Sequence, residues 1–144
     1  MHVVSNLDEL NFFLRRFAPR VTLRMAPDAV EVTSAEGHFR VAAVVTVVEN
    51  RGHSRVAAIG DDPVASGVRI NVFARAATDK HQANGYFETF LQAALQRLPK
   101  TSGIIRPVVL VENLGSLDPV LLGRQNEMAI RAIERWGAVA AVIT

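Results

Sequence analysis

The sequence predicts an α/β fold with a mixed sheet, in which three antiparallel strands are followed by a helix, a strand, a second helix and a last strand. Two observations support this order. The first half of the chain contains short β-branched runs separated by turn-forming residues. The second half alternates such runs with amphipathic segments of helical spacing, which is typical of β-α-β units with parallel strands.

The first predicted element is an amphipathic helix over residues 7–17. Ser5 or Asn6 suits its N-cap, and Pro19 ends it. Charged residues occupy one side of this helix, and the apolar side comprises Leu7, Leu10, Phe13, Leu14 and Phe17. We therefore divide the chain into an N-terminal amphipathic helix, residues 1–18, and a single domain, residues 19–144.

Bulky aromatic residues next to arginines allow two roles for this helix. It can lie in a membrane interface, where a helix of about three turns binds weakly and reversibly, or it can pack on its own domain or on a partner chain. The residues expected to dock are Leu10, Phe13, Leu14 and Phe17 through apolar contacts, and Arg15 and Arg16 through contacts with anionic groups.

Strands follow this helix. Residues 21–25 and 29–33 are joined across a turn-forming Ala-Pro-Asp sequence, and residues 39–49 form a long valine-rich strand. An Asn-Arg-Gly turn leads into a return strand over residues 55–59, and residues 68–73 form another extended piece. Three strands in antiparallel succession therefore precede the helical half.

The first long helix starts at Thr78 or Asp79 and reaches Leu98, where Pro99 stops it. Aromatic residues at this spacing indicate core packing rather than a cofactor or base-stacking site. Its apolar stripe comprises Ala83, Phe87, Phe90, Leu91, Ala94 and Leu98, with Tyr86 at the edge.

The most regular unit comes last, with a strand over residues 107–112, a helix over residues 119–136 and a strand over residues 138–143. Asp118 suits the N-cap of this helix, Pro119 its first position, and Gly137 a left-handed stop. The apolar side of the helix comprises Leu121, Leu122, Met128, Ala129, Ala132, Ile133 and Trp136.

Composition excludes several classes of protein. The 144 residues, 49% of them hydrophobic, suit one domain with a substantial core. The absence of cysteine excludes disulfides and thiolate sites and fits a cytoplasmic location. The net charge of +2 comes from scattered basic residues, so we expect no nucleic-acid partner. The longest apolar run, residues 41–48, is too short to span a bilayer, and the chain does not begin with a secretory signal pattern.

Few residues indicate a catalytic or ligand site, and we expect no cofactor and no metal. The histidines are isolated and lack metal-ligand spacing. Gly115 and Ser116, ahead of the last helix, form a candidate anion site, because backbone amides at a helix N-terminus attract negative charge. Asp118, as the predicted cap, competes for the same amides.

Besides a β-hairpin, five segments share their pattern and order with one family. They are Phe12-Phe13-Leu14-Arg15-Arg16-Phe17, Val-Ala-Ala-Ile-Gly-Asp at residues 56–61, the helix around residues 86–98, Arg-Pro-Val-Val-Leu-Val at residues 106–111, and Trp-Gly-Ala-Val-Ala-Ala-Val-Ile at residues 136–143. In these segments the chain resembles the first subdomain of the rod-shape-determining bacterial actins, the MreB family. The resemblance implies a ribonuclease-H-like, actin-like fold and a bacterial protein connected with the cytoskeleton and cell shape.

The phosphate loop departs from that family's pattern. The family's first strand ends in Asp-Leu-Gly-Thr, whose carboxylate serves the metal and water around ATP, whereas this chain has Arg24, Met25, Ala26 and Pro27 there. Arg24 reverses the charge, Ala26 crowds the approach to phosphate, and Pro27 removes an N–H and a hydroxyl. The first strand also lacks the carboxylate that a metal-dependent nuclease of the ribonuclease-H-like fold needs. We expect neither nuclease activity, nor ATP hydrolysis, nor tight ATP binding.

Two hypotheses follow. The first is a non-catalytic actin-like scaffold or regulatory protein in the cytoplasm, peripheral to the inner face of the membrane. The second half of the actins does not follow the last predicted strand, so this hypothesis includes a protein partner or self-association that covers the exposed surface. The alternative is a small ligand- or nucleotide-binding domain, or an enzyme, that reuses the ribonuclease-H-like fold.

Overall fold

The computed structural model describes residues 1–62, 66–73, 80–99, 105–117, 121 and 123–144, with the side chains of the long helix from residue 85 onward. The strands are β1 (His2–Val4), β2 (Arg20–Met25), β3 (Ala29–Ser34), β4 (Gly37–Ala42), β5 (Val44–Asn50), β6 (His53–Ile59), β7 (Val68–Asn71), β8 (Val108–Glu112) and β9 (Ala140–Ile143). The helices are η1 (Leu7–Glu9), α1 (Phe12–Phe17), α2 (Lys80–Gln96), η2 (Leu114–Leu117) and α4 (Gln125–Trp136).

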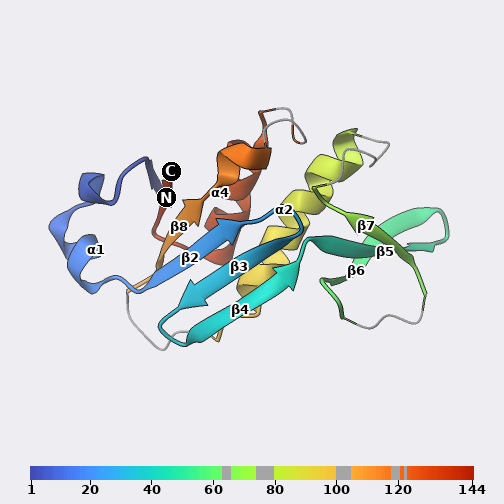
Figure 1. The fold of residues 1–144 in the computed structure, drawn as a ribbon, viewed down its shortest axis with the longest axis horizontal. Helices are drawn as coiled ribbons and strands as arrows, with labels where there is room; N and C mark the ends of the chain where they lie inside the picture. Colours follow the sequence, from blue (N-terminus) through green and yellow to red (C-terminus); the bar gives the residue numbers. More distant parts are fainter. Residues whose placement is uncertain (63–65, 74–79, 100–104, 118–120, 122) are drawn as a thin grey trace.

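Six strands form the main sheet, in the order β1-β9-β8-β2-β3-β4 (Figure 1). The strand β2 pairs parallel with β8 and antiparallel with β3, and β3 pairs antiparallel with β4. Both β8 and β1 pair parallel with β9, so β3 alone runs against the other five strands. The register places Leu23 beside Val32 and Val111, so that the apolar side chains of neighbouring strands share one face.

The helices α2 and α4 pack against each other and cover this apolar face, behind the sheet in Figure 1. The α/β class is confirmed, and the described members of the two predicted apolar helix sides are buried or half-buried. Fully buried residues on the sheet side include Leu23, Val30, Val32 and Val111, and on the helix side Phe87, Phe90, Leu91, Met128 and Ile133.

A second sheet joins β6, β5 and β7 in that order, all antiparallel, and packs against α2. The prediction of one long strand over residues 39–49 is therefore wrong, because the chain leaves the main sheet at Ala43. The Ala43 N–H donates to the Asp28 carbonyl at 2.8 Å, and its carbonyl accepts from the Val72 N–H at 2.9 Å. Val41 and Val45 are buried on either side of this junction, which explains why the apolar pattern continues through it.

The continuous helix predicted over residues 119–136 is also wrong. Gly123 has a φ of 79°, and α4 begins only at Gln125, after Arg124. The predicted stop is confirmed, since Gly137 is left-handed and its N–H donates to the Ile133 and Glu134 carbonyls. The predicted cap and first position, residues 118 and 119, lie outside the described residues, as do residue 122 and the predicted start of α2 at residues 78 and 79.

The N-terminal segment, defined here as residues 1–18, is not the single helix that the sequence predicts. It consists of the strand β1, the short 3₁₀ turn η1 and the six-residue helix α1. Because β1 pairs with β9, this segment adds a strand to the edge of the main sheet.

Candidate functional site

The N-terminal segment is held to the domain by its leucines. Leu10 and Leu14 are buried, and they form a second apolar cluster on the face of the main sheet that the long helices do not cover. The floor of this cluster is Val108, Ala140 and Val142, from β8 and β9. Two of the six residues predicted to dock elsewhere are therefore part of the protein's own core.

The phenylalanines of the same segment point into solvent. The side chains of Phe12, Phe13 and Phe17 are 68%, 53% and 57% exposed, respectively. We call these three residues the Phe patch. The rings of Phe13 and Phe17 lie 5.3 Å apart between centroids, so they form a joined apolar surface. Single exposed apolar residues are common on proteins, whereas here two phenylalanine rings are in contact and a third exposed phenylalanine lies on the same helix.

Arginines border the Phe patch. Arg15 and Arg16 are exposed, as predicted, in the last turn of α1. Arg15 lies 3.9 Å from the Asp8 carboxylate, a separation that gives a weak surface ion pair. The Arg20 guanidinium donates to the Arg15 carbonyl at 2.8 Å and thereby fixes the end of the helix against β2.

Two asparagines explain why the segment divides into two short helices. The Asn6 side chain accepts from the Asp8 N–H at 3.0 Å, and the Asn11 side chain accepts from the Leu14 N–H at 2.9 Å. Each asparagine is a helix cap, and the second cap restarts the helix at Phe12. Phe12 interrupts the apolar pattern of a continuous helix and was not among the residues predicted to dock, yet it is the most exposed member of the Phe patch.

The residues that resemble a degenerate phosphate loop form the end of β2 and a tight hairpin turn. The Ala26 N–H donates to the Ala29 carbonyl at 2.9 Å, which closes this turn on itself. The Met25 side chain is buried in the helix-covered core, and Pro27 has no N–H to donate. Arg24 lies on the opposite face of the sheet, in register with Glu31 on one side and Glu112 on the other.

The sequence predicts that the candidate anion site lies at the start of a long helix, and in the structure it does not. Gly115 and Ser116 lie in the 3₁₀ turn η2, well before α4 begins at Gln125. The Ser116 hydroxyl donates to the Asn113 carbonyl at 2.7 Å, and the Ser116 N–H donates to the same oxygen at 3.2 Å. Both Ser116 donors are therefore engaged within the turn.

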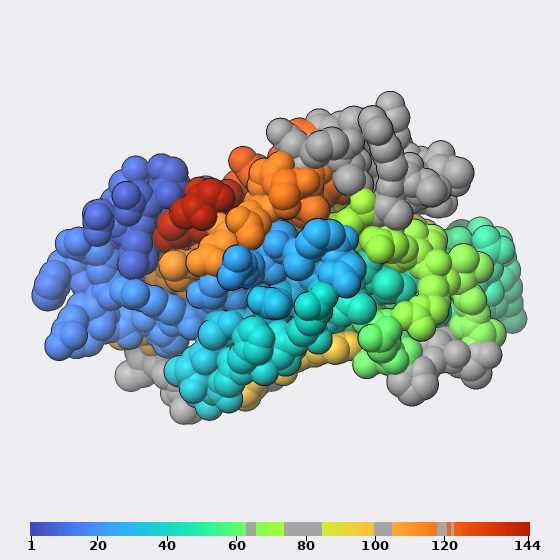
Figure 2. Space-filling model, viewed as in Figure 1, coloured from blue at the N-terminus to red at the C-terminus, as the bar shows by residue number. Residues whose placement is uncertain are grey.

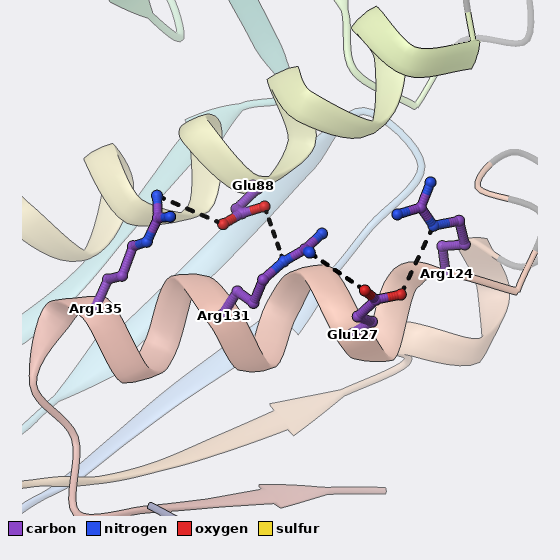
Figure 3. A network of polar contacts seen from close by, with 5 residues as sticks. All are labelled: Glu88, Arg124, Glu127, Arg131 and Arg135. Atoms are coloured by element: carbon purple, nitrogen blue, oxygen red, sulfur yellow. Dashed lines mark hydrogen bonds and ion pairs between the residues drawn. The ribbon is translucent and has the colours of Figure 1, made fainter.

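Ion pairs join α2 and α4 (Figure 3), and the sequence analysis did not predict them. Glu88 of α2, whose side chain is only 15% exposed, lies 3.2 Å from Arg131 and 3.7 Å from Arg135 of α4. Arg131 also lies 3.2 Å from Glu127, and Glu127 lies 3.7 Å from Arg124. The three-residue and four-residue spacings within α4 are visible in the sequence, but the cross-helix pairs depend on how the helices pack.

This network joins the two helices. Within the residues that the structure describes, no group of three histidine or acidic side chains is arranged to hold a metal ion. A pocket of roughly 50 Å³ lies beside the ends of β2 and α4, with room for a few water molecules. Its lining is mainly apolar and includes Pro19, Leu98, Pro99, Pro107 and Trp136.

Comparison with known proteins supports the fold and leaves the family open. No family model matches the chain, and no curated protein matches it. Among solved structures, it is similar to a non-polymerising A278D mutant of the actin-like protein MamK bound to AMPPNP, with a TM-score of 0.56 and 11% sequence identity. The match covers 88% of this chain and 40% of the MamK chain. At that identity the likeness concerns the fold alone, and it shows that this chain has an actin-like fold.

Proposed function

We propose that this protein is a non-catalytic actin-like scaffold or regulatory protein, connected with the bacterial cytoskeleton, that binds anionic membrane surfaces through the Phe patch and its arginines. The observation that carries the proposal is that the short helix α1 has one buried side and one exposed apolar and basic side. Leu14 is buried against the sheet, whereas Phe12, Phe13 and Phe17 face solvent beside Arg15 and Arg16. Because the buried leucine holds the helix on the sheet, the exposed phenylalanines have a fixed position from which to contact a membrane.

The expected affinity is low. Full transfer of a phenylalanine side chain out of water is worth roughly 1.5–3 kcal/mol, and a basic residue near an anionic membrane contributes about 1 kcal/mol. The Phe patch is already partly covered by its own domain, so partial insertion together with two arginines gives on the order of 5 kcal/mol, which corresponds to a dissociation constant below about 1 mM. The proposal is thus a peripheral, reversible contact. No helix in the described part of the chain is long and apolar enough to cross a bilayer.

The hairpin after β2 supports a role without ATP chemistry. The MamK structure holds AMPPNP, and this chain corresponds to 40% of that protein. In this chain the turn at Ala26 and Pro27 is closed by its own hydrogen bond, and Arg24 stands in register between two glutamates. A guanidinium at this position repels the divalent cation that accompanies a nucleotide, so we propose that ATP does not bind tightly.

Liposome flotation tests the membrane proposal, and point substitutions suit it better than truncation. Removing residues 1–18 would take β1 from the sheet edge and expose Val108, Ala140 and Val142. The test variant is therefore Phe12→Ser, Phe13→Ser and Phe17→Ser together, and a second variant is Arg15→Gln with Arg16→Gln.

Matched controls come from the second sheet. Val68→Ser removes another exposed apolar side chain, which is 65% exposed, and Arg51→Gln with Arg55→Gln removes two exposed charges. We expect the wild type and both controls to float with vesicles containing phosphatidylserine, and the Phe patch variant to stay in solution. The arginine variant should float less, and salt should weaken flotation of the wild type.

Two results would contradict the proposal. One is a folded wild type that does not float at any vesicle concentration, and the other is a Phe patch variant that floats as well as the wild type. Calorimetry with ATP and magnesium separately tests the proposal that ATP does not bind tightly. Saturable micromolar binding there would favour the nucleotide-binding alternative.

A further inference from the structure

The face of the main sheet opposite α2 and α4 is only partly covered. The N-terminal segment packs over β8 and β9 at one side of this face. Over β2, β3 and β4, the described part of the chain places no helix, and these strands form the centre of the surface in Figure 2 (blue to cyan). Their outward side chains are exposed or half-buried, including Thr22, Arg24, Glu31, Thr33 and Arg40.

Charges of alternating sign cross this open face in one row. The strand register places Glu112 of β8 beside Arg24 of β2, Arg24 beside Glu31 of β3, and Glu31 beside Arg40 of β4. Neighbouring strands lie about 4.8 Å apart, so the row spans roughly 14 Å from β8 to β4. A second row, two residues away along each strand, contains Thr22, Thr33 and His38, and its β8 member, Leu110, packs against the N-terminal segment.

The row is only partly neutralised within the chain. Arg40 lies 2.7 Å from Asp28 and 3.9 Å from Glu31. Arg24 and Glu112 make no ion pair within 4.0 Å among the described residues, although they are register neighbours. Two charges of opposite sign on this face therefore remain available to another molecule.

Symmetry decides which molecule fits. A two-fold axis parallel to the strands, between β2 and β3, turns the row end for end when a second copy is laid face to face. Arg24 of one copy then faces Glu31 of the other, and Glu112 faces Arg40. Every charge in the row meets its opposite, and in the second row Thr22 meets Thr33. A two-fold axis along the row instead places each charge against itself, which is strongly unfavourable.

We propose that this open face is a self-association surface and that its occupant is a second copy of this chain, related by a two-fold axis parallel to the strands. Such an interface is isologous, with the same patch used by both copies. Two sheets packed face to face lie about 10 Å apart with their strands nearly aligned, so each N-terminal segment lies beside the β4 edge of the other copy. The inference deepens the scaffold proposal and does not depend on lipid binding.

The expected dimer is weak and sensitive to salt. The open face comprises β2, β3 and β4 with Glu112 at the end of β8, because the N-terminal segment covers the earlier residues of β8. This area is smaller than the standard interface of about 800 Å² per partner, which predicts a transient contact. Exposed ion pairs add modest stability but strongly disfavour mismatched charges. Salt should weaken the dimer as the screening length falls.

Sedimentation equilibrium without lipid tests this inference through a charge exchange at the centre of the row. The Arg24→Glu variant makes residues 24 and 31 both acidic, and the Glu31→Arg variant makes both basic, so each variant repels its own copy across the axis. When the two variants are mixed, the acidic pair faces the basic pair. We expect each variant alone to dimerise on the order of 10- to 100-fold more weakly than the wild type, and the mixture to recover a heterodimer.

The Arg55→Glu variant is the matched control, because it makes the same charge change on an exposed residue of β6, away from the open face. It should dimerise like the wild type. Circular dichroism checks that every variant is folded. If a charge reversal unfolds the sheet, Arg24→Gln and Glu31→Gln replace the reversals, and each should weaken the dimer several-fold.

Three outcomes would overturn the inference. A wild type that stays monomeric at roughly 1 mM in low salt has no such surface. A folded Arg24→Glu variant that dimerises like the wild type uses another surface. Two variants that are each monomeric and do not associate when mixed show that the charges act in some other way. None of these outcomes bears on flotation, so failure here is distinct from failure of the membrane proposal.

Discussion

The two faces of the main sheet are built from the same strands but differ in what they contact. One face carries Leu23, Val32 and Val111 and is covered by α2 and α4. The other carries Thr22, Arg24 and their neighbours, and is covered at one side by the N-terminal segment. The covered face resembles the interior of any α/β protein and supplies stability. The features particular to this chain, the Phe patch and the alternating charges, lie on the other face.

The largest expected difference between the faces appears within β2. The Leu23→Ala variant should lose about 3–5 kcal/mol of unfolding free energy, because it leaves a cavity among fully buried side chains. The matched Thr22→Val variant, one residue away on the open face, should change it by less than about 0.5 kcal/mol. Urea unfolding measures both. Similar losses for the two variants would show that the faces do not differ in packing.

A smaller difference is expected within α1. The Leu14→Ala variant should lose roughly 2–3 kcal/mol, since Leu14 is buried in the smaller cluster over β8 and β9. The Phe13→Ala variant should lose less than about 1 kcal/mol, because that side chain is half exposed. Thermal unfolding of the two variants compares them directly. A larger loss for Phe13→Ala would place the Phe patch in the core and weaken the membrane proposal.

The smallest effect concerns the polar contacts of the two helices that cover the sheet. The Glu88→Gln variant removes a half-buried charge that lies between Arg131 and Arg135, and should lose roughly 1–2 kcal/mol. The Glu127→Gln variant removes a carboxylate that is 56% exposed, and should lose about 0.5 kcal/mol or less. Chemical unfolding at low and high salt distinguishes the two variants, because salt screens the ion pairs of the exposed Glu127 more than those of Glu88. Equal losses would mean that burial of Glu88 has no energetic role.

The covered face could be predicted from sequence because its signals are local. Helical spacing identified the buried side of α2, and Gly137 marked the end of α4. The change of sheet at Ala43 could not be predicted, because the side chains on both sides of it are buried and the valine pattern does not break there. Three-residue β1 carries no periodic signal and exists through its pairing with β9.

Most residues of the candidate site were named from the sequence, but which of their side chains are exposed was not predicted. A continuous helix would place Leu14 and Phe17 on one apolar side, and the sequence therefore assigned both to docking. The cap at Asn11 restarts the helix, so the leucines turn inward and Phe12 joins the exposed side. Glu88 was not recognised, because its partners lie on another helix. The alternating charge row was not recognised either, since it requires the register of four strands.

Because β1 pairs with β9, the N-terminal segment cannot fold until the end of the chain has been synthesised. His2 pairs with Ala140, and Leu10 and Leu14 rest on Val108, Ala140 and Val142, all of which leave the ribosome long after the N-terminal segment. Such distant pairings form late in folding. Until β9 emerges, the nascent segment has neither a strand to pair with nor an apolar floor, so its leucines and phenylalanines are exposed together. Completion of β9 then separates them, taking the leucines into the protein and leaving the phenylalanines outside.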